Sequence, residues 1–272
     1  MNPSPYVRLH AAESLVAFGY AEAVLPIFEL ALEREGNLPG QRICVWRVLA
    51  RAKRTATERT RHVDQICAVC LSPGSPDAAS AAESLAKLKY RVDAAHRTQF
   101  EHAIERLPGS AIPHGRWLLA VSGNAHDLER LTDLLGDPDP IIRGIAAYAL
   151  RHIRDTLPTA TLERILAVAM AETDPSSRKY CISAAFITAS ENADFANLKQ
   201  AILDYLSHGT NDEKYESATA LGIRGAAGDL DILVPLLHDA DADVQVAAST
   251  AVLQILARTG EFTLRNIPYA VA

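Results

Sequence analysis

The chain has 272 residues, of which 49% are hydrophobic and 22% charged, and its formal net charge is −6. This composition excludes a disordered chain, and the lack of an apolar run of about 18 residues excludes an ordinary membrane-spanning helix. Cys44, Cys67, Cys70 and Cys181 are too few and too scattered for a disulfide scaffold, so we expect a cytoplasmic protein with no membrane association.

A pattern of the form V-R-x-x-A-A-x-x-L recurs along the whole chain, first in SPYVRLHAAESL and most clearly in DPDPIIRGIAAYAL from Asp137. We call the residue that aligns with Arg8 the anchor of each copy. Successive anchors are 31 to 36 residues apart, which leaves room for two helices and two short turns. The eight anchors are Arg8, Arg42, Ala78, Ile112, Arg143, Arg178, Lys214 and Gln245.

Each copy is predicted to form two helices and no strand. Apolar or small residues recur three, four and seven positions after the anchor, as in Ala146, Ala147 and Leu150, which is helical periodicity. The second helix of each copy is the more aliphatic one, as in AEAVLPIFELAL from Ala21 and FANLKQAILDYL from Phe195.

The turns carry residues that begin and end helices. Asp139, Asp174 and Asp241 lie four residues before their anchors, as does Ser4, and are predicted to accept hydrogen bonds from free amides of the next helix. Prolines at 138, 140 and 175 reinforce the break between helices. Eleven residues after an anchor, a left-handed residue is predicted to end the helix at Gly19, Gly123 and Gly225.

These repeated features together resemble the HEAT family of repeats, in the short form named after phycobilisome lyases. The resemblance covers residues 1–272 as a single domain, although the copies anchored at Ala78 and Ile112 lack the basic residue. It implies an all-α fold, a right-handed α-α superhelix of about eight two-helix repeats. It further implies that the anchor-bearing helices line a concave groove and that the basic anchors bond to aspartates of neighbouring turns.

The variable positions of the anchor-bearing helices are the candidates for recognising a partner. Aromatic and basic side chains gather there, and Tyr, Trp and Arg supply most of the binding energy at protein interfaces. An alternative is that the tyrosines only pack between adjacent helices. The candidates are His114, Trp117, Tyr148, Lys179, Tyr180 and Tyr215.

The second copy contains a basic segment, RICVWRVLARAKRTATERTR, in which Arg47, Arg51 and Arg54 form one helical stripe. Such a stripe could bind a phosphate, a carboxylate or an acidic partner segment, or it could be an ordinary solvated face. Residues 137–272 contain 11 basic and 18 acidic side chains, and this excess of acids makes nucleic acid an improbable partner.

No catalytic motif stands out. Cys67 and Cys70 form a C-x-x-C within an apolar helical stretch, with no second pair at zinc-finger spacing, which favours core packing over metal or redox chemistry. His-Glu dipeptides, which the HEAT-like deoxyhypusine hydroxylases use to bind iron, are absent. We expect no cofactor and no bound metal.

Three functions remain open at this stage. The first is a non-catalytic scaffold that holds a protein or peptide in its concave groove. The second is an enzyme or enzyme subunit related to HEAT-like DNA glycosylases or bilin lyases, with Trp46 and Trp117 in a cleft. The third is a region of a larger bacterial enzyme or transporter, suggested by the start on an anchor-bearing helix and by the apolar tail EFTLRNIPYAVA.

Overall fold

The structure is a computed structural model that describes residues 5–35, 40–53, 55–191 and 193–260. Within these ranges the chain is all-α, with no β-strand. Each of the eight anchors lies in the first turn of a separate odd-numbered helix, and we call these the anchor helices. The anchor helices are α1 (Pro5–Ala17), α3 (Gln41–Ala52), α5 (Ala78–Lys87), α7 (Ile112–Ala120), α9 (Pro140–Arg151), α11 (Pro175–Thr188), α13 (Asn211–Arg224) and α15 (Ala242–Thr259).

Between the anchor helices lie the even-numbered second helices. They are α2 (Ala21–Glu35), α4 (Ala56–Leu71), α6 (Arg97–Glu105), α8 (Ala125–Asp133), α10 (Thr159–Ala171), α12 (Ala193–His208) and the short α14 (Leu230–Leu233). Five 3-10 turns complete the described elements: η1 (Gly109–Ala111), η2 (Leu134–Gly136), η3 (Arg154–Thr156), η4 (Ala227–Asp229) and η5 (Val234–His238).

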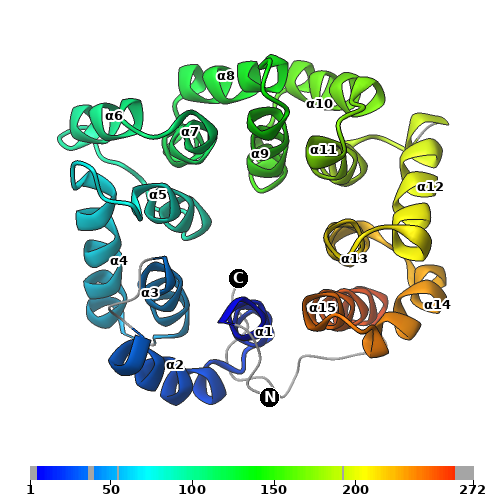
Figure 1. The fold of residues 1–272 in the computed structure, drawn as a ribbon, viewed down its shortest axis with the longest axis horizontal. Helices are drawn as coiled ribbons and strands as arrows, with labels where there is room; N and C mark the ends of the chain where they lie inside the picture. Colours follow the sequence, from blue (N-terminus) through cyan, green and yellow to red (C-terminus); the bar gives the residue numbers. More distant parts are fainter. Residues whose placement is uncertain (1–4, 36–39, 54, 192, 261–272) are drawn as a thin grey trace. The chain divides into compact units, whose positions relative to one another are not determined.

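The described residues form two compact units. Of these residues, unit 1 contains 5–14 and those from 138 to 260, and unit 2 contains those from 15 to 137. In unit 1, α9, α11, α13 and α15 pack in succession as one layer, and α10, α12 and α14 form a second layer against them (Figure 1). In unit 2, α3, α5 and α7 pack in succession, each in contact with second helices (Figure 1).

The core of each unit consists of the small and aliphatic residues of the repeated pattern. Ala146, Ala147 and Leu150 of α9 are fully buried, as are the corresponding residues of α5. Alanines let neighbouring helices approach closely, so Leu150 and its equivalents fill the space between them. Leu15 occupies the same position in α1 but is 42% exposed, so the first copy departs from this pattern.

The predicted caps are present at the helix starts that the structure describes. Asp139 accepts a hydrogen bond from the Ile141 amide (2.9 Å), Asp174 from the Ser176 amide (3.0 Å) and Asp241 from the Asp243 amide (2.9 Å). Gly19 and Gly123 have φ of 89° and 90°, as expected for left-handed residues. The prediction for Gly225 was wrong, because its φ is −64°. Ser4 and the apolar tail from Glu261 lie outside the described residues.

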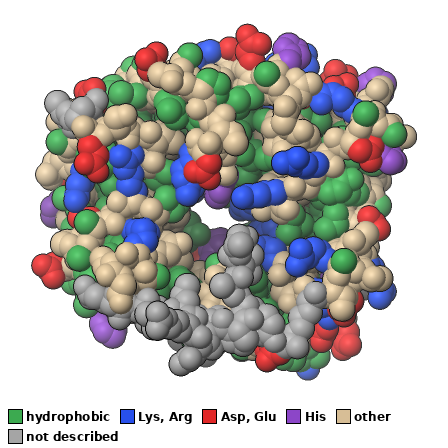
Figure 2. Space-filling view, turned by 180° about the vertical axis from the view of Figure 1, so that it is seen from behind, with side chains coloured by type: hydrophobic (Ala, Val, Ile, Leu, Met, Phe, Trp, Pro, Cys, Tyr) green, Lys and Arg blue, Asp and Glu red, His purple; other side chains and the backbone are tan. Residues whose placement is uncertain are grey.

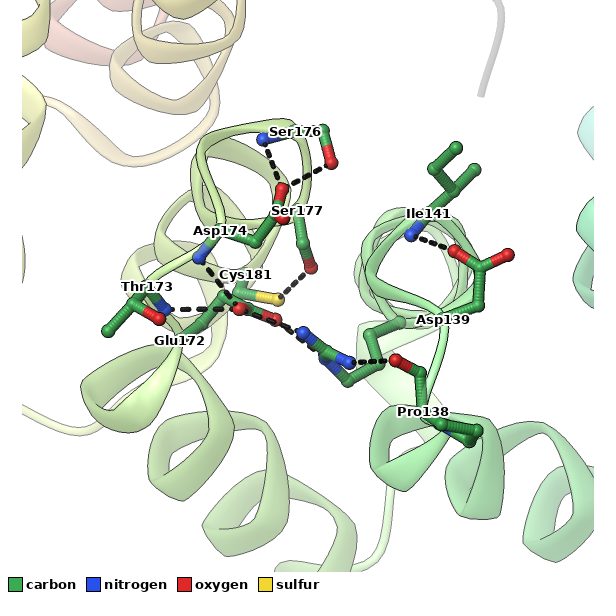
Figure 3. Close-up of polar contacts among 10 residues, drawn as sticks. Pro138, Asp139, Ile141, Glu172, Thr173, Asp174, Ser176, Ser177 and Cys181 are labelled. Carbon is green, nitrogen blue, oxygen red and sulfur yellow. Dashed lines mark hydrogen bonds and ion pairs between the residues drawn. The ribbon is translucent and has the colours of Figure 1, made fainter.

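The basic anchors Arg42, Arg143 and Lys214 pair with acids in the turn before the next anchor helix. Arg143 binds Glu172 through two hydrogen bonds (Nε to Oε2, 2.7 Å; Nη2 to Oε1, 2.9 Å), and Glu172 also accepts the amides of Thr173 and Asp174 (Figure 3). The partner here is a glutamate, although an aspartate was expected. Aspartates do fill the role in the pairs Arg42–Asp77 (3.0 Å) and Lys214–Asp239 (2.8 Å).

Candidate partner-binding surface

The candidate residues divide between the two units. Arg47 and Arg51 lie on α3 and His114 and Trp117 on α7, all in unit 2. Tyr148 on α9, Lys179 and Tyr180 on α11 and Tyr215 on α13 belong to unit 1. Arg54 lies outside the described residues.

Two candidates of unit 2 are buried, contrary to the expectation that they face solvent. Trp117 is 1% exposed and Arg47 is 3% exposed. The guanidinium of Arg47 donates a hydrogen bond from Nη1 to Ser84 Oγ on α5 (2.9 Å). Trp117 is enclosed because α7 packs against both α5 and α8. Neither side chain is therefore accessible to a partner, and Arg47 does not continue an exposed basic stripe with the half-buried Arg51.

Glu83 of α5 interacts with three basic side chains of unit 2. It forms an ion pair with Lys87 (2.8 Å). Burial alone would raise the pKa of Glu83, but the positive charge of Lys87, with His114 and Arg47, holds it well below its usual range. Burial lowers the pKa of His114, whose Nδ1 has no hydrogen-bond partner. The negative charge of Glu83 offsets positive charge within unit 2, so these residues do not form an exposed basic surface.

Unit 1 contains a buried ion pair that spans three anchor helices. Arg151 of α9 pairs with Glu216 of α13 and donates a hydrogen bond from Nη1 to Ser183 Oγ of α11 (2.7 Å). The side chains of Arg151 and Glu216 are only 4% and 7% exposed. Burial would lower the pKa of Arg151, but Glu216 more than offsets this effect and raises it. Arg151 and Glu216 therefore both stay charged, and their contacts connect α9, α11 and α13.

Two half-buried tyrosines lie against this pair. The guanidinium carbon of Arg151 is 4.5 Å from the centre of the Tyr148 ring, a cation–π distance. The rings of Tyr148 and Tyr180 meet edge to face, with centroids 6.0 Å apart and an interplanar angle of 81°. Lys179 Nζ lies 5.2 Å from the centre of the Tyr180 ring and pairs with Asp212 (2.8 Å). The structure thus brings Tyr148, Lys179 and Tyr180 together, and we call these three residues the tyrosine surface.

Tyrosine hydroxyls of this region stay protonated at neutral pH. Burial raises the pKa of Tyr180 to about 12, and the nearby Glu216 and Asp212 raise it further. Burial also raises the pKa of Tyr215 well above its usual value. The tyrosine surface therefore offers a neutral hydrogen-bond donor at Tyr180 beside the cation of Lys179.

Tyr215 interacts electrostatically with Tyr148 and Arg151, but its ring packs against α1. Its ring lies 5.1 Å from the ring of His10 on α1, and His10 Nδ1 is 2.9 Å from Asp243 Oδ1 on α15. Ser14 of α1 lies 2.6 Å from Thr250 of α15, measured between hydroxyl oxygens. Tyr215 therefore belongs to the site that holds α1, and its ring packs against His10.

The sequence analysis did not select Arg151 or Glu216 as candidates. Arg151 lies eight residues after its anchor, whereas the aromatic and basic candidates from His114 to Tyr215 lie one to five residues after theirs. Its spacing of three residues from Tyr148 was the available signal, because residues three apart are neighbours on a helix. Its partner Glu216 is 65 residues away in the sequence, and the contact between them depends on how three anchor helices pack.

Of the cysteines of α4 and α11, Cys70 and Cys181 are buried and Cys67 is half-buried. Burial raises the pKa of Cys67 to about 11, of Cys70 to about 12 and of Cys181 to about 11. Thiols with such values stay protonated at neutral pH, which disfavours nucleophilic or metal-binding roles. Within the described part of the chain, no group of three histidine, cysteine or acidic side chains is arranged to hold a metal ion.

Two further findings concern the surface. On the face drawn in Figure 2, basic and acidic side chains are interspersed among hydrophobic ones. Among the described helices, none combines the length and apolarity needed to cross a membrane.

Comparison with known proteins found no matching family model, no matching curated protein and no matching solved structure.

Proposed function

We propose that the chain is a non-catalytic scaffold that binds a protein or peptide through the tyrosine surface of Tyr148, Lys179 and Tyr180. The proposal includes a HEAT-like architecture, a right-handed superhelix of about eight two-helix repeats, and a cytoplasmic location. Support for the architecture comes from the anchors, each of which begins its own helix, and from the repeated pairing of basic anchors with acids.

The observation that carries the binding proposal is the support of the tyrosine rings by the buried pair Arg151–Glu216. The Tyr148 ring is contacted by the guanidinium of Arg151 and, edge to face, by the rings of His152 and Tyr180. A tyrosine that is already ordered loses little conformational entropy when a partner binds, so its buried area translates efficiently into affinity.

The chemistry of the tyrosine surface suits a protein partner. Tyrosine rings bury large apolar area while their hydroxyls still form hydrogen bonds, and this combination dominates protein interfaces. The Lys179 side chain is 12% exposed and forms an ion pair with the 77%-exposed Asp212, which a carboxylate of the partner can replace.

The alternative of an enzyme with a glycosylase-like cleft loses its main support. That interpretation placed Trp46 and Trp117 in an open cleft, but Trp117 is 1% exposed. A DNA mobility shift at low ionic strength tests what remains of this alternative, because a protein that recognises DNA binds more tightly as salt is lowered.

Capture of partners from a cell lysate tests the binding proposal. The double variant Tyr148→Ala/Tyr180→Ala should lose proteins that the unchanged chain captures, as quantified by mass spectrometry. Tyr20→Ala is the matched control, because Tyr20 is an exposed tyrosine in unit 2 and should leave capture unchanged.

Circular dichroism and thermal unfolding establish that each variant is folded before capture is compared. Equal capture by the unchanged chain and by a folded double variant contradicts the proposal. Equal loss in Tyr20→Ala also contradicts it, because the effect would then not be specific to the tyrosine surface.

A further inference from the structure

Residues 5–14 of α1 contact helices that are distant in sequence. They belong to unit 1 together with the described residues from 138 to 260, whereas Leu15, in the same helix, begins unit 2. The contacts of His10 with Asp243 and of Ser14 with Thr250 join residues 233 and 236 positions apart. We call the site formed by Tyr215, Asp243 and Thr250 the α1 seat.

The α1 seat recognises a specific pattern of side chains. His10 and Ser14 are four residues apart, so they lie on one side of α1. On α15, Asp243 and Thr250 are seven residues apart, which also places them on one side of that helix. The ring of Tyr215 on α13 lies 5.1 Å from the ring of His10 and completes the seat.

The polar contacts in the seat are those of a reversible interface. The side chains of His10 and Asp243 are 29% and 33% exposed, and polar contacts between side chains at such exposure contribute little to stability. By contrast, α15 is fixed in unit 1 by fully buried residues, including Val244, Ala248 and Ile255. Residues 5–14 bury two apolar side chains, Leu9 and Ala12, against five in α15, so removing α1 from the seat exposes less apolar surface than removing α15 would.

We propose that the α1 seat also accepts residues 5–14 of a second copy of the chain. Every copy presents the same His10 and Ser14, so the seat cannot distinguish its own helix from another. Reciprocal exchange fills both seats with the same contacts, which is the requirement for a closed pair with identical interfaces. This proposal is independent of the proposed function, because it concerns the seat and not the tyrosine surface.

A disulfide between separately labelled copies tests the exchange directly. The native cysteines are first replaced by alanine, then one preparation carries Ser14→Cys and a second carries Thr250→Cys. The two hydroxyl oxygens are 2.6 Å apart, so sulfur atoms at these positions can reach one another. A 14–250 disulfide in the mixture can form only between copies.

The control mixture pairs Ser14→Cys with Ser207→Cys, an exposed serine of α12 outside the seat. The disulfide dimer of Ser14→Cys with Thr250→Cys should exceed the control dimer by about tenfold, because only the seat brings the two sulfurs to disulfide distance. Its yield should rise with protein concentration. Peptide mapping identifies the linked residues.

A third preparation carries both Ser14→Cys and Thr250→Cys in one chain. If it closes within the monomer while the mixture gives no more dimer than the control, the seat holds only its own helix and the proposal is wrong. If neither forms the 14–250 disulfide, residues 5–14 do not occupy the seat in solution, and the proposal is wrong for that reason.

Discussion

Arg151 and Glu216 carry opposite charges inside unit 1, and this makes the two residues strongly interdependent. A buried charge that loses its partner keeps its full desolvation cost. We expect Arg151→Met to lower the free energy of unfolding by about 3–5 kcal/mol, because Glu216 is left uncompensated. Urea denaturation followed by circular dichroism measures this loss.

The double variant Arg151→Met/Glu216→Leu separates the pair from its surroundings. Because both charges are gone, its loss of stability should be smaller than the sum of the losses in the two single variants. Additive losses would mean that Arg151 and Glu216 do not interact in solution.

Glu172 makes stability depend on pH. The hydrogen bonds from Arg143 lower the pKa of Glu172 to about 2 in the folded protein, below the ordinary value of an unfolded chain. A lowered folded pKa stabilises the protein above the unfolded pKa, and this stabilisation is lost as the pH falls towards the folded value. The loss between pH 5 and pH 2 should reach about 3 kcal/mol at most.

Comparing the unchanged protein with Glu172→Gln isolates the contribution of the Glu172 carboxylate to the pH dependence of stability. Urea unfolding of both proteins at several pH values between 2 and 7 should show a shallower acid dependence for the variant, which has no carboxylate to titrate. Identical acid dependence in the two proteins would exclude Glu172 as a source of it.

At the scale of the helix, each capping aspartate accepts a hydrogen bond from a free amide at the start of an anchor helix. Asp174 satisfies the amide of Ser176 and adds a negative charge at the start of α11. Asp174→Ala should destabilise the protein by about 1 kcal/mol, whereas Asp174→Asn should cost less because asparagine also accepts the bond. Thermal unfolding of the two variants checks this order, and the opposite order would contradict the capping role.

Close helix packing at Gly115 gives a second prediction at this scale. A Cβ atom added to Gly115 of α7 would lie 2.6 Å from the side chain of Ile104. Gly115→Ala should therefore destabilise the protein by about 1–3 kcal/mol through overpacking. The cost of Gly115→Ala should be smaller in an Ile104→Ala background, because that change removes the two Cγ atoms that the new Cβ would meet. An equal cost in both backgrounds, or a neutral Gly115→Ala, would contradict the close contact with Ile104.

The helices and their caps could be predicted from the sequence because they depend on local patterns of residues. Spacing of small residues located the anchor helices, and Asp139, Asp174 and Asp241 marked their starts. Gly225 misled because glycine permits a left-handed conformation without requiring it. The burial of Trp117 and the pairing of Arg151 with Glu216 depend on contacts between helices, which position in the repeat does not determine.

Across the molecule, the same repeated unit serves two purposes. Matched positions supply the core and the pairs between basic anchors and acids, as in Arg143–Glu172 and Lys214–Asp239. Positions that differ between copies supply Tyr148, Lys179 and Tyr180 on two successive anchor helices. In the proposed scaffold, the first set holds the helices in place and the second set recognises the partner.

Hydrogen–deuterium exchange of the chain with and without a captured partner tests the role of the tyrosine surface most directly. The partner should slow exchange in the second half of α9 and the first half of α11, which carry the tyrosine surface. Slower exchange confined to the second helices α10 and α12, with α9 and α11 unchanged, would contradict it.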